Sequence, residues 1–161
     1  MSSWLYAAPL HAAGAYEWVT SPEVTAHRVP AQAPEPRPFP SLREVVAAFR
    51  AAGCHGDSWF RTNGDPATVL PPCPGLKCRT NDLGEVSPTR KTGGDNDVWL
   101  PDTPVESVGF RKPSGYAVLR AVCALTPATG PLLVADEDGE VFIVSPGDQP
   151  EALEPDWPWR W

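Results

Sequence analysis

Four residues with side chains that can bind zinc follow the clearest predicted helix: Cys54, His55, Cys73 and Cys78. Thiolate and imidazole groups are the usual protein ligands of zinc. Cys54 and His55 are neighbours in the chain, however, and the four-residue gap between Cys73 and Cys78 is looser than the two-residue gap that preorganises a pair of thiolates. We therefore predict no metal and no other cofactor. The alternative is a small enzyme or zinc-binding module that uses these four residues.

A second candidate for chemistry is Ser58, which lies in the block Gly56-Asp57-Ser58. This block resembles the nucleophile block of the SGNH hydrolases, and the Gly-Asp-Asn-Asp sequence at 94–97 is similar to the block that helps to form the oxyanion hole in that family. The resemblance implies a serine nucleophile, which needs a histidine late in the chain as its general base. No histidine follows His55. The sequence therefore assigns no catalytic residue and favours a protein that is not an enzyme.

Charge is distributed unevenly along the chain, whose formal net charge is −7. Residues 1–120 contain twelve basic and twelve acidic side chains, whereas residues 121–161 contain eight acidic side chains and one arginine. An acidic surface attracts basic proteins and repels the phosphate backbone of nucleic acid. We therefore predict a basic protein partner and no nucleic acid. The alternative is a solvated acidic rim that only keeps the protein soluble. The carboxylates predicted to bind the partner are Asp136, Glu137, Asp138 and Glu140.

The C-terminal residues contain three of the seven tryptophans, Trp157, Trp159 and Trp161. In an extended chain these side chains point to the same side, because successive side chains alternate between the two faces of a strand. Tryptophan is among the commonest anchors of protein interfaces, so all three are predicted partner-binding residues. The alternative, which we favour, is that the tail folds back and seals the core, since exposed apolar patches of that size are uncommon.

The segment 105–144 has the most consistent local signals and is expected to form a strand, a helix and a hairpin. Ser114 is a good N-cap for a helix over Ser114–Leu125, which Pro127 should end. Two apolar runs then flank Asp138-Gly139, a strong signal for a type I′ turn. That turn would place Ala135 opposite Phe142 and Leu133 opposite Val144. Both faces of the hairpin are apolar, which predicts a central position with cover on both sides.

Other segments give weaker or shorter signals. Ser41–Ala52 is the best single helix, with a capping box and a glycine stop. Trp4–Leu10 is expected to be a strand that pairs with Ala12–Thr20. The proline-rich segment 22–40 is typical of an extended connector. The long segment 65–96 either contains short strands, for example near Leu83–Val86, or is a functional loop.

Together these elements predict an α+β fold in one domain, residues 1–161. It comprises N-terminal strands with the connector (1–40), a core (41–146) and an acidic tryptophan-rich tail (147–161). We expect about five strands in a mixed or antiparallel sheet with two main helices, compatible with a ferredoxin-like arrangement plus an added hairpin. The longest uncharged stretch near the core, 121–135, is shorter than the roughly 18 apolar residues of a membrane span.

The chain start lacks the basic and apolar regions of a signal peptide, so we expect a cytoplasmic protein with reduced cysteines and no membrane partner. The oligomeric state is not defined by the sequence. The leading functional interpretation is a non-catalytic protein-binding protein with an acidic C-terminal surface, of the general type of bacterial immunity proteins that neutralise toxins.

Overall fold

The computed structural model describes residues 3–75, 79–91 and 97–161. These residues form one mixed sheet of seven strands with four α-helices and three short 3-10 helices. The strands are β1 (Trp4–Pro9), β2 (Thr25–His27), β3 (His55–Ser58), β4 (Asp82–Thr89), β5 (Ser107–Arg111), β6 (Leu132–Ala135) and β7 (Glu140–Val144). The α-helices are α1 (Ala15–Val19), α2 (Leu42–Ala51), α3 (Gly115–Thr129) and α4 (Pro150–Leu153), and the 3-10 helices are η1 (Pro66–Thr68), η2 (Arg79–Asn81) and η3 (Glu154–Asp156).

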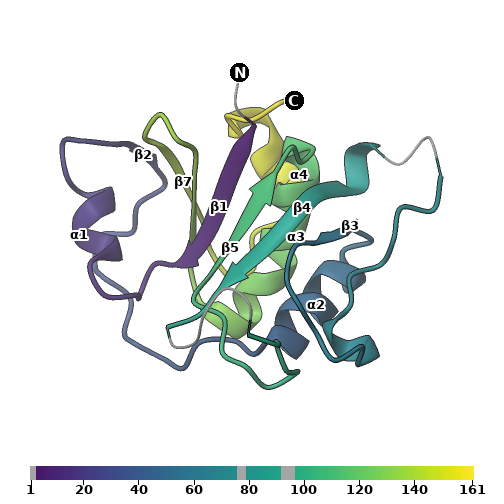
Figure 1. The fold of residues 1–161 in the computed structure, drawn as a ribbon. Coiled ribbons are helices and arrows are strands. Elements are labelled where there is room, and N and C mark those ends of the chain that lie inside the picture. Colours follow the sequence, from purple (N-terminus) through teal and green to yellow (C-terminus); the bar gives the residue numbers. More distant parts are fainter. Residues whose placement is uncertain (1–2, 76–78, 92–96) are drawn as a thin grey trace.

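The sheet has the strand order β2-β7-β6-β1-β5-β4-β3, and only the outermost pairs, β2 with β7 and β3 with β4, are parallel (Figure 1). Apart from the inserted α1, β2 and β3, the inner part follows the chain as β1-α2-β4-β5-α3-β6, and its strands pair in the order β6-β1-β5-β4. This is the β-α-β-β-α-β connectivity of a ferredoxin-like arrangement, to which the hairpin adds β7.

The predicted α+β class is confirmed, but the predicted count of about five strands and two main helices is too low. The additional elements are short. β2 and β3 have three and four residues, and α1 and α4 have five and four. Segments of this length show too little periodicity in the sequence to be assigned from it.

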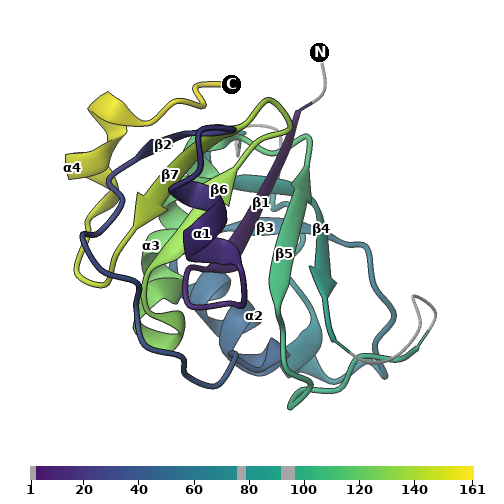
Figure 2. The ribbon, with the colours of Figure 1, turned by 90° about the vertical axis from the view of Figure 1, so that its left-hand side faces the viewer.

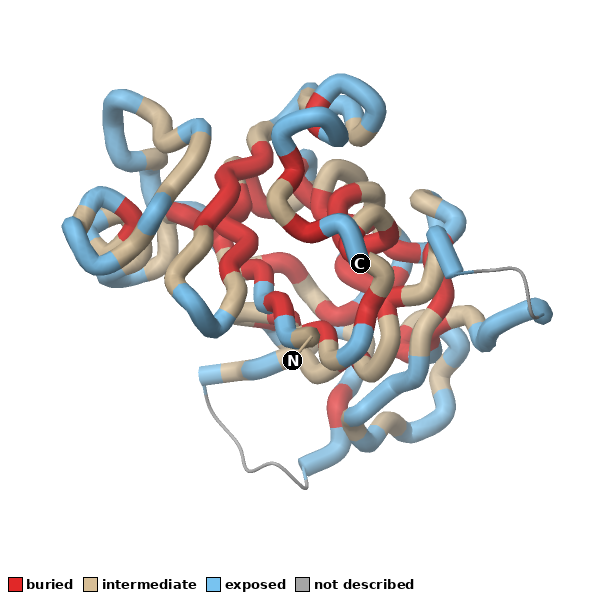
Figure 3. The backbone as a smooth tube through the Cα atoms, turned by 90° about the horizontal axis from the view of Figure 1, so that it is seen from above, coloured by how far each residue is buried: buried red, intermediate tan, exposed pale blue. Residues whose placement is uncertain are grey.

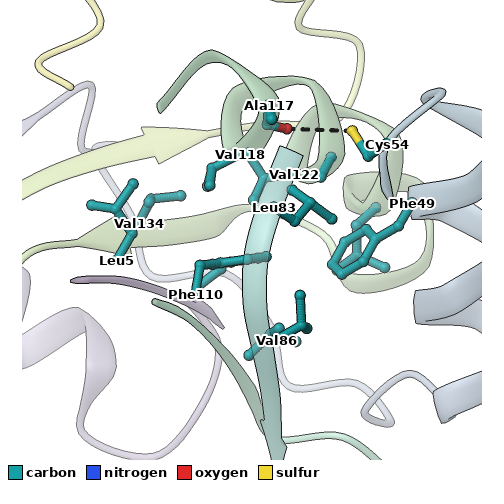
Figure 4. Packing of buried hydrophobic residues seen from close by; sticks show 14 of the residues in the cluster. Leu5, Phe49, Cys54, Leu83, Val86, Phe110, Ala117, Val118, Val122 and Val134 are labelled. Atoms are coloured by element: carbon teal, nitrogen blue, oxygen red, sulfur yellow. Dashed lines mark hydrogen bonds between the residues drawn. The ribbon is translucent and has the colours of Figure 1, made fainter. Parts of the chain in front are cut away.

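Helices α2 and α3 cover one face of the sheet and form the main core with it (Figure 4). α2 is set by the predicted capping box, in which the Ser41 hydroxyl accepts the Glu44 amide at 3.2 Å and the Glu44 carboxylate accepts the Ser41 amide at 3.1 Å. Phe49 of α2 then packs on Phe110 of β5, with ring centroids 5.9 Å apart. Buried residues gather in the middle of the molecule, and exposed loops surround them (Figure 3).

The hairpin of β6 and β7 is buried on both faces, as predicted, but its position is not central, since β7 lies next to the edge strand β2 and β1 is the middle strand. Its register differs from the predicted one by one residue, since Val134 pairs with Phe142 and Ala135 pairs with Val141. The cause is the side chain of Asp136, which accepts the amides of Asp138 at 2.9 Å and Glu140 at 3.0 Å. This side-chain turn adds a residue to the loop, so the strands are not joined by the two-residue type I′ turn.

Helix α3 continues to Thr129, beyond the predicted end near Leu125. Pro127 lacks the amide that would bond to the carbonyl of Cys123 in a regular helix. The hydroxyl of Thr126 donates to that carbonyl instead, at 3.0 Å. The last turn therefore keeps its acceptor satisfied, and the proline is tolerated.

Two further segments differ from expectation. Ala12–Thr20 contains helix α1 and not a strand, because Ala15, Tyr16 and Val19 lie on one helical face that packs over Leu133 and Ile143. Within the long segment 65–96, the described residues include the eight-residue strand β4. Among the residues described, no helix has the length and apolar composition needed to cross a membrane.

Candidate functional site

The four predicted zinc ligands lie in different surroundings. Cys54 is buried, and its thiol donates to the carbonyl of Ala117 at 3.5 Å in the core (Figure 4). His55 is buried beside Asp82, with 3.8 Å between Nδ1 and the carboxylate. Cys73 is exposed and disulfide-bonded, which corrects the expectation that every cysteine is reduced, and Cys78 lies outside the described residues. The described ranges contain no group of three or more side chains placed to hold a metal ion.

Burial also determines the reactivity of Cys54. Desolvation raises the pKa of its thiol to about 11, against a weaker opposing effect of Arg120. The thiolate is the reactive form of cysteine, so at about pH 8 only about one thiol in a thousand would be ionised. We expect iodoacetamide to modify Cys54 in the unfolded chain but not in the folded protein, as measured by mass spectrometry of peptides. Rapid labelling of the folded protein at Cys54 would contradict this and would restore Cys54 as a candidate nucleophile.

Of the two blocks that resemble the SGNH hydrolases, the structure describes the serine block in full and the second block only in part. Ser58 is exposed at the end of β3. Of the block at 94–97, only Asp97 lies within the described residues, so the second half of the predicted resemblance is outside them.

The predicted acidic turn divides into two structural and two exposed carboxylates. Asp136 holds the turn through one carboxylate oxygen and accepts the indole N–H of Trp159 through the other, at 2.9 Å. Glu140 lies 2.6 Å from Nε2 of His27, which joins β7 to the edge strand β2. Glu137 and Asp138 are exposed at the tip. The exposed carboxylates of the turn are therefore Glu137 and Asp138.

The tryptophan tail folds back onto the core for most of its length. Trp157 and Trp159 have exposed fractions of 3% and 4%, whereas Trp161 is 41% exposed. The ring of Trp157 contacts Phe142 and Trp159 at centroid distances of 5.1 and 4.8 Å, and its indole N–H donates to the carbonyl of Gly115 at 3.0 Å. Trp157 and Trp159 are thus core residues in this structure, and Trp161 is the only one of the three that is accessible as an anchor.

The structure reveals an exposed surface that the sequence analysis does not identify. On the face of the sheet opposite α2 and α3, helix α1 covers β6 and β7, whereas β5 and β4 stand beside it without a helix in front (Figure 2). We call the uncovered surface of β1, β5, β4 and the end of β3 the open face. Its large aromatic side chains are Trp4 and Tyr6 of β1 and Trp59 after β3, which are 38%, 37% and 55% exposed.

The strand register arranges the open face in rows. One row runs from Trp4 through Arg111 to Glu85, and the next contains Tyr6 and Gly109. Arg111 donates to Glu85 at 3.0 Å, and its guanidinium lies 5.5 Å from the centroid of the Trp59 ring.

The Trp4 ring lies beside Gly109, since a Cβ atom at that position would be in van der Waals contact with the ring, 3.6 Å away. The open face therefore presents aromatic side chains next to an ion pair, and both are held by the sheet.

The acidic turn borders this surface. Tyr6 pairs with Ala135, and the turn begins at the next residue. The ring of Trp18 from α1 also lies beside Tyr6, with 6.4 Å between the two ring centroids. The turn with Glu137 and Asp138 thus follows the residue that pairs with β1, at one end of the open face.

A sequence signal for the open face exists. Trp4-Leu5-Tyr6-Ala7 alternates exposed and buried residues, and Ser107–Arg111 alternates half-buried and buried residues. Alternation is typical of a sheet with one face in water. Reading Trp4–Leu10 only as an aromatic and apolar run hides this pattern.

Comparison of the chain with protein-family models, with curated proteins and with solved structures finds no match.

Proposed function

We propose that this protein is a non-catalytic protein-binding protein whose open face and acidic turn form one docking surface for a basic protein partner. The observation that carries the proposal is the set of three exposed aromatic side chains, Trp4, Tyr6 and Trp59, on an uncovered half of the sheet. Tryptophan and tyrosine are enriched among residues that dominate binding energy. Strand β1 holds the rings of Trp4 and Tyr6 in place, so little ordering of these two residues is required when a partner binds.

The charges around the open face favour a basic partner. Its arginine, Arg111, is already paired with Glu85. Asp57 on β3 is exposed beside that pair, and Glu137 and Asp138 are exposed at the turn. These carboxylates would repel the phosphates of a nucleic acid that stacked on the aromatic rings. They would attract lysine and arginine side chains placed around an apolar anchor of a protein.

The proposal includes a role of the bacterial immunity type, in which a small acidic protein neutralises a basic toxin. It rests on the net charge of −7 and on the concentration of that charge in residues 121–161. The acidic site contains fewer exposed carboxylates than the sequence predicts. Asp136 accepts the amides of the hairpin turn, and Glu140 contacts His27 of β2. We propose Glu137, Asp138 and Trp161 as the partner-binding residues that remain from the predicted set, together with Trp4 and Tyr6.

Removing charge at the turn should slow association with a basic ligand. As a defined probe we choose a short peptide that alternates lysine with leucine, and the variant is Glu137→Gln with Asp138→Asn. Charges act over a Debye length of about 8 Å at physiological salt, so the loss should appear in the association rate and should shrink at high salt. Stopped-flow tryptophan fluorescence measures the rate.

The matched control removes two exposed carboxylates at the other end of the acidic segment, Glu151→Gln with Asp156→Asn. It makes the same change in net charge, away from the open face. Association that slows equally in both variants would show that only net charge matters. A peptide that does not bind the wild-type protein at low salt would remove the support for the proposal.

A further inference from the structure

A second surface feature lies beside the C-terminal tail. It is a hollow of about 490 Å³ between η2, the end of β5, the start of α3 and the C-terminal residues. We call it the tail pocket. Its wall contains three basic residues, Arg79, Lys112 and Arg160, and two acidic ones, Asp82 and Glu154. A basic majority is unusual here, because the chain has 20 acidic and 13 basic side chains.

The basic side chains of the tail pocket lack the carboxylate partners found elsewhere. Arg28 and Arg111 each lie 3.0 Å from a carboxylate oxygen. Within the described part of the chain, the side chains of Arg79 and Lys112 form no ion pair and no hydrogen bond. Arg160 donates to the carbonyls of Glu154 and Pro155, at 3.0 and 2.8 Å, which are neutral acceptors. The positive charge is therefore available to a ligand.

The two acidic residues of the tail pocket do not fully cancel the positive charge of its three basic residues. The Asp82 carboxylate is occupied by the amide of Gly84, at 2.8 Å, and lies near His55. Glu154 is exposed. The backbone amide at the start of α3, that of Gly115, already donates to the main-chain oxygen of Trp161. An anion in the tail pocket would thus be held by side chains and not by the helix terminus.

The backbone keeps Lys112 in an unusual conformation at the rim. Its φ of 55° lies in the left-handed region, which non-glycine residues seldom adopt and which is enriched at binding sites. Its amide donates to the carbonyl of Ser3 at 2.7 Å, which fixes this conformation. Lys112 is therefore positioned by the fold, although its side chain has no partner in it.

The other part of the wall is aromatic. Tyr116 is partly exposed, Trp161 is 41% exposed, and the nearly buried Trp157 and Trp159 also line the tail pocket. Rings of this kind stack on planar ligands, and guanidinium groups bind carboxylates and phosphates. We propose that the tail pocket binds a small ligand with a planar aromatic ring and an anionic group, either a carboxylate or a phosphate.

Two probe pairs test the proposal by isothermal titration calorimetry on the full chain. The pairs are 2-naphthoate with 2-naphthalenemethanol, and adenosine monophosphate with adenosine. We expect at least one anion to bind about tenfold or more tightly than its neutral partner. Tight naphthoate binding alone indicates a carboxylate ligand, and tight nucleotide binding alone indicates a phosphate ligand. Anions that do not bind, or that bind no better than the neutral compounds, would overturn the proposal.

Variants locate the binding. Arg79→Gln with Lys112→Gln should weaken the anion about tenfold or more and leave the neutral compound unchanged. The control, Arg43→Gln with Lys91→Gln, makes the same charge change on residues that do not line the tail pocket. Equal weakening in both would show general attraction to positive charge and would overturn the site. Neither variant alters the open face, so this result is separable from the test of protein binding.

Discussion

The Gly84→Ala variant is expected to lose roughly 2–5 kcal/mol of its free energy of unfolding, from backbone strain and overpacking together. Gly84 has φ of 68°, and an added Cβ atom would lie 2.2 Å from the carbonyl oxygen of Arg111 and 2.7 Å from that of Lys112. Both obstacles are backbone atoms of the neighbouring chain segment, so no side chain can move aside. Urea denaturation measures the change.

The position of Gly84 explains why a glycine is required. β3 pairs with β4 at His55–Asp82 and at Asp57–Glu85, so β4 has one residue more than its partner over this stretch. Such a β-bulge is commonly built on a glycine in the left-handed conformation. It lets both Leu83 and Val86 enter the main core.

Gly64→Ala is the matched control for this prediction. Gly64 also has positive φ, 85°, but no atom lies within 4 Å of a Cβ placed there. It should lose only about 1 kcal/mol, the strain of the conformation itself. Equal losses in the two variants would contradict the close approach of β4 to the end of β5.

The second large effect is expected for Trp157→Ala, about 3–5 kcal/mol of the free energy of unfolding, as for other buried large aromatic residues. The ring is 3% exposed, packs edge-to-face on Phe142 and Trp159, and donates to Gly115. Truncation would open a cavity between the tail and β7 and remove the indole N–H that donates to the carbonyl of Gly115. Thermal and urea unfolding both measure this loss.

Trp161→Ala is the comparison, since this side chain is 41% exposed and surface substitutions usually change stability by about 0.5 kcal/mol or less. The two variants separate the two interpretations of the tail. If Trp157→Ala were as stable as the wild type, Trp157 would not seal the core, and its interpretation as a surface anchor would return.

Much of the inner fold is predictable because local signals agree with the tertiary structure there. The capping box of Ser41 and Glu44 sets α2, and the apolar runs of 132–135 and 141–144 give a hairpin buried on both faces. These signals support the α+β class, whereas β4, which completes the ferredoxin-like arrangement, lies in the segment 65–96, for which the sequence predicts either short strands or a loop.

Other features depend on contacts between distant residues or on single side chains. The hairpin register is decided by the carboxylate of Asp136, and the end of α3 by the hydroxyl of Thr126. The edge strand β2 exists because it pairs with β7, and its three residues carry no pattern of their own. The hydrophobic periodicity of the sequence does not predict the hairpin register, the end of α3 or the strand β2.

The candidate site is predicted only in part for the same reason. The charge split along the sequence identifies the acidic turn, but not that Asp136 and Glu140 bond within the fold. The tail identifies tryptophans, but their burial depends on Phe142 and on Gly115 at the start of α3. Predicting the open face requires the knowledge that α1 covers β6 and β7 and leaves β1 partly uncovered.

The most direct test of protein binding is a titration of isotopically labelled protein with the lysine–leucine peptide, followed by the shifts of its amide resonances. We predict that the largest shifts map to Trp4, Tyr6, Gly109 and Asp138, and that a peptide with glutamate in place of lysine causes none. Shifts confined to the α4 region around Glu151, or spread evenly over all acidic residues, would contradict a docking surface on the open face.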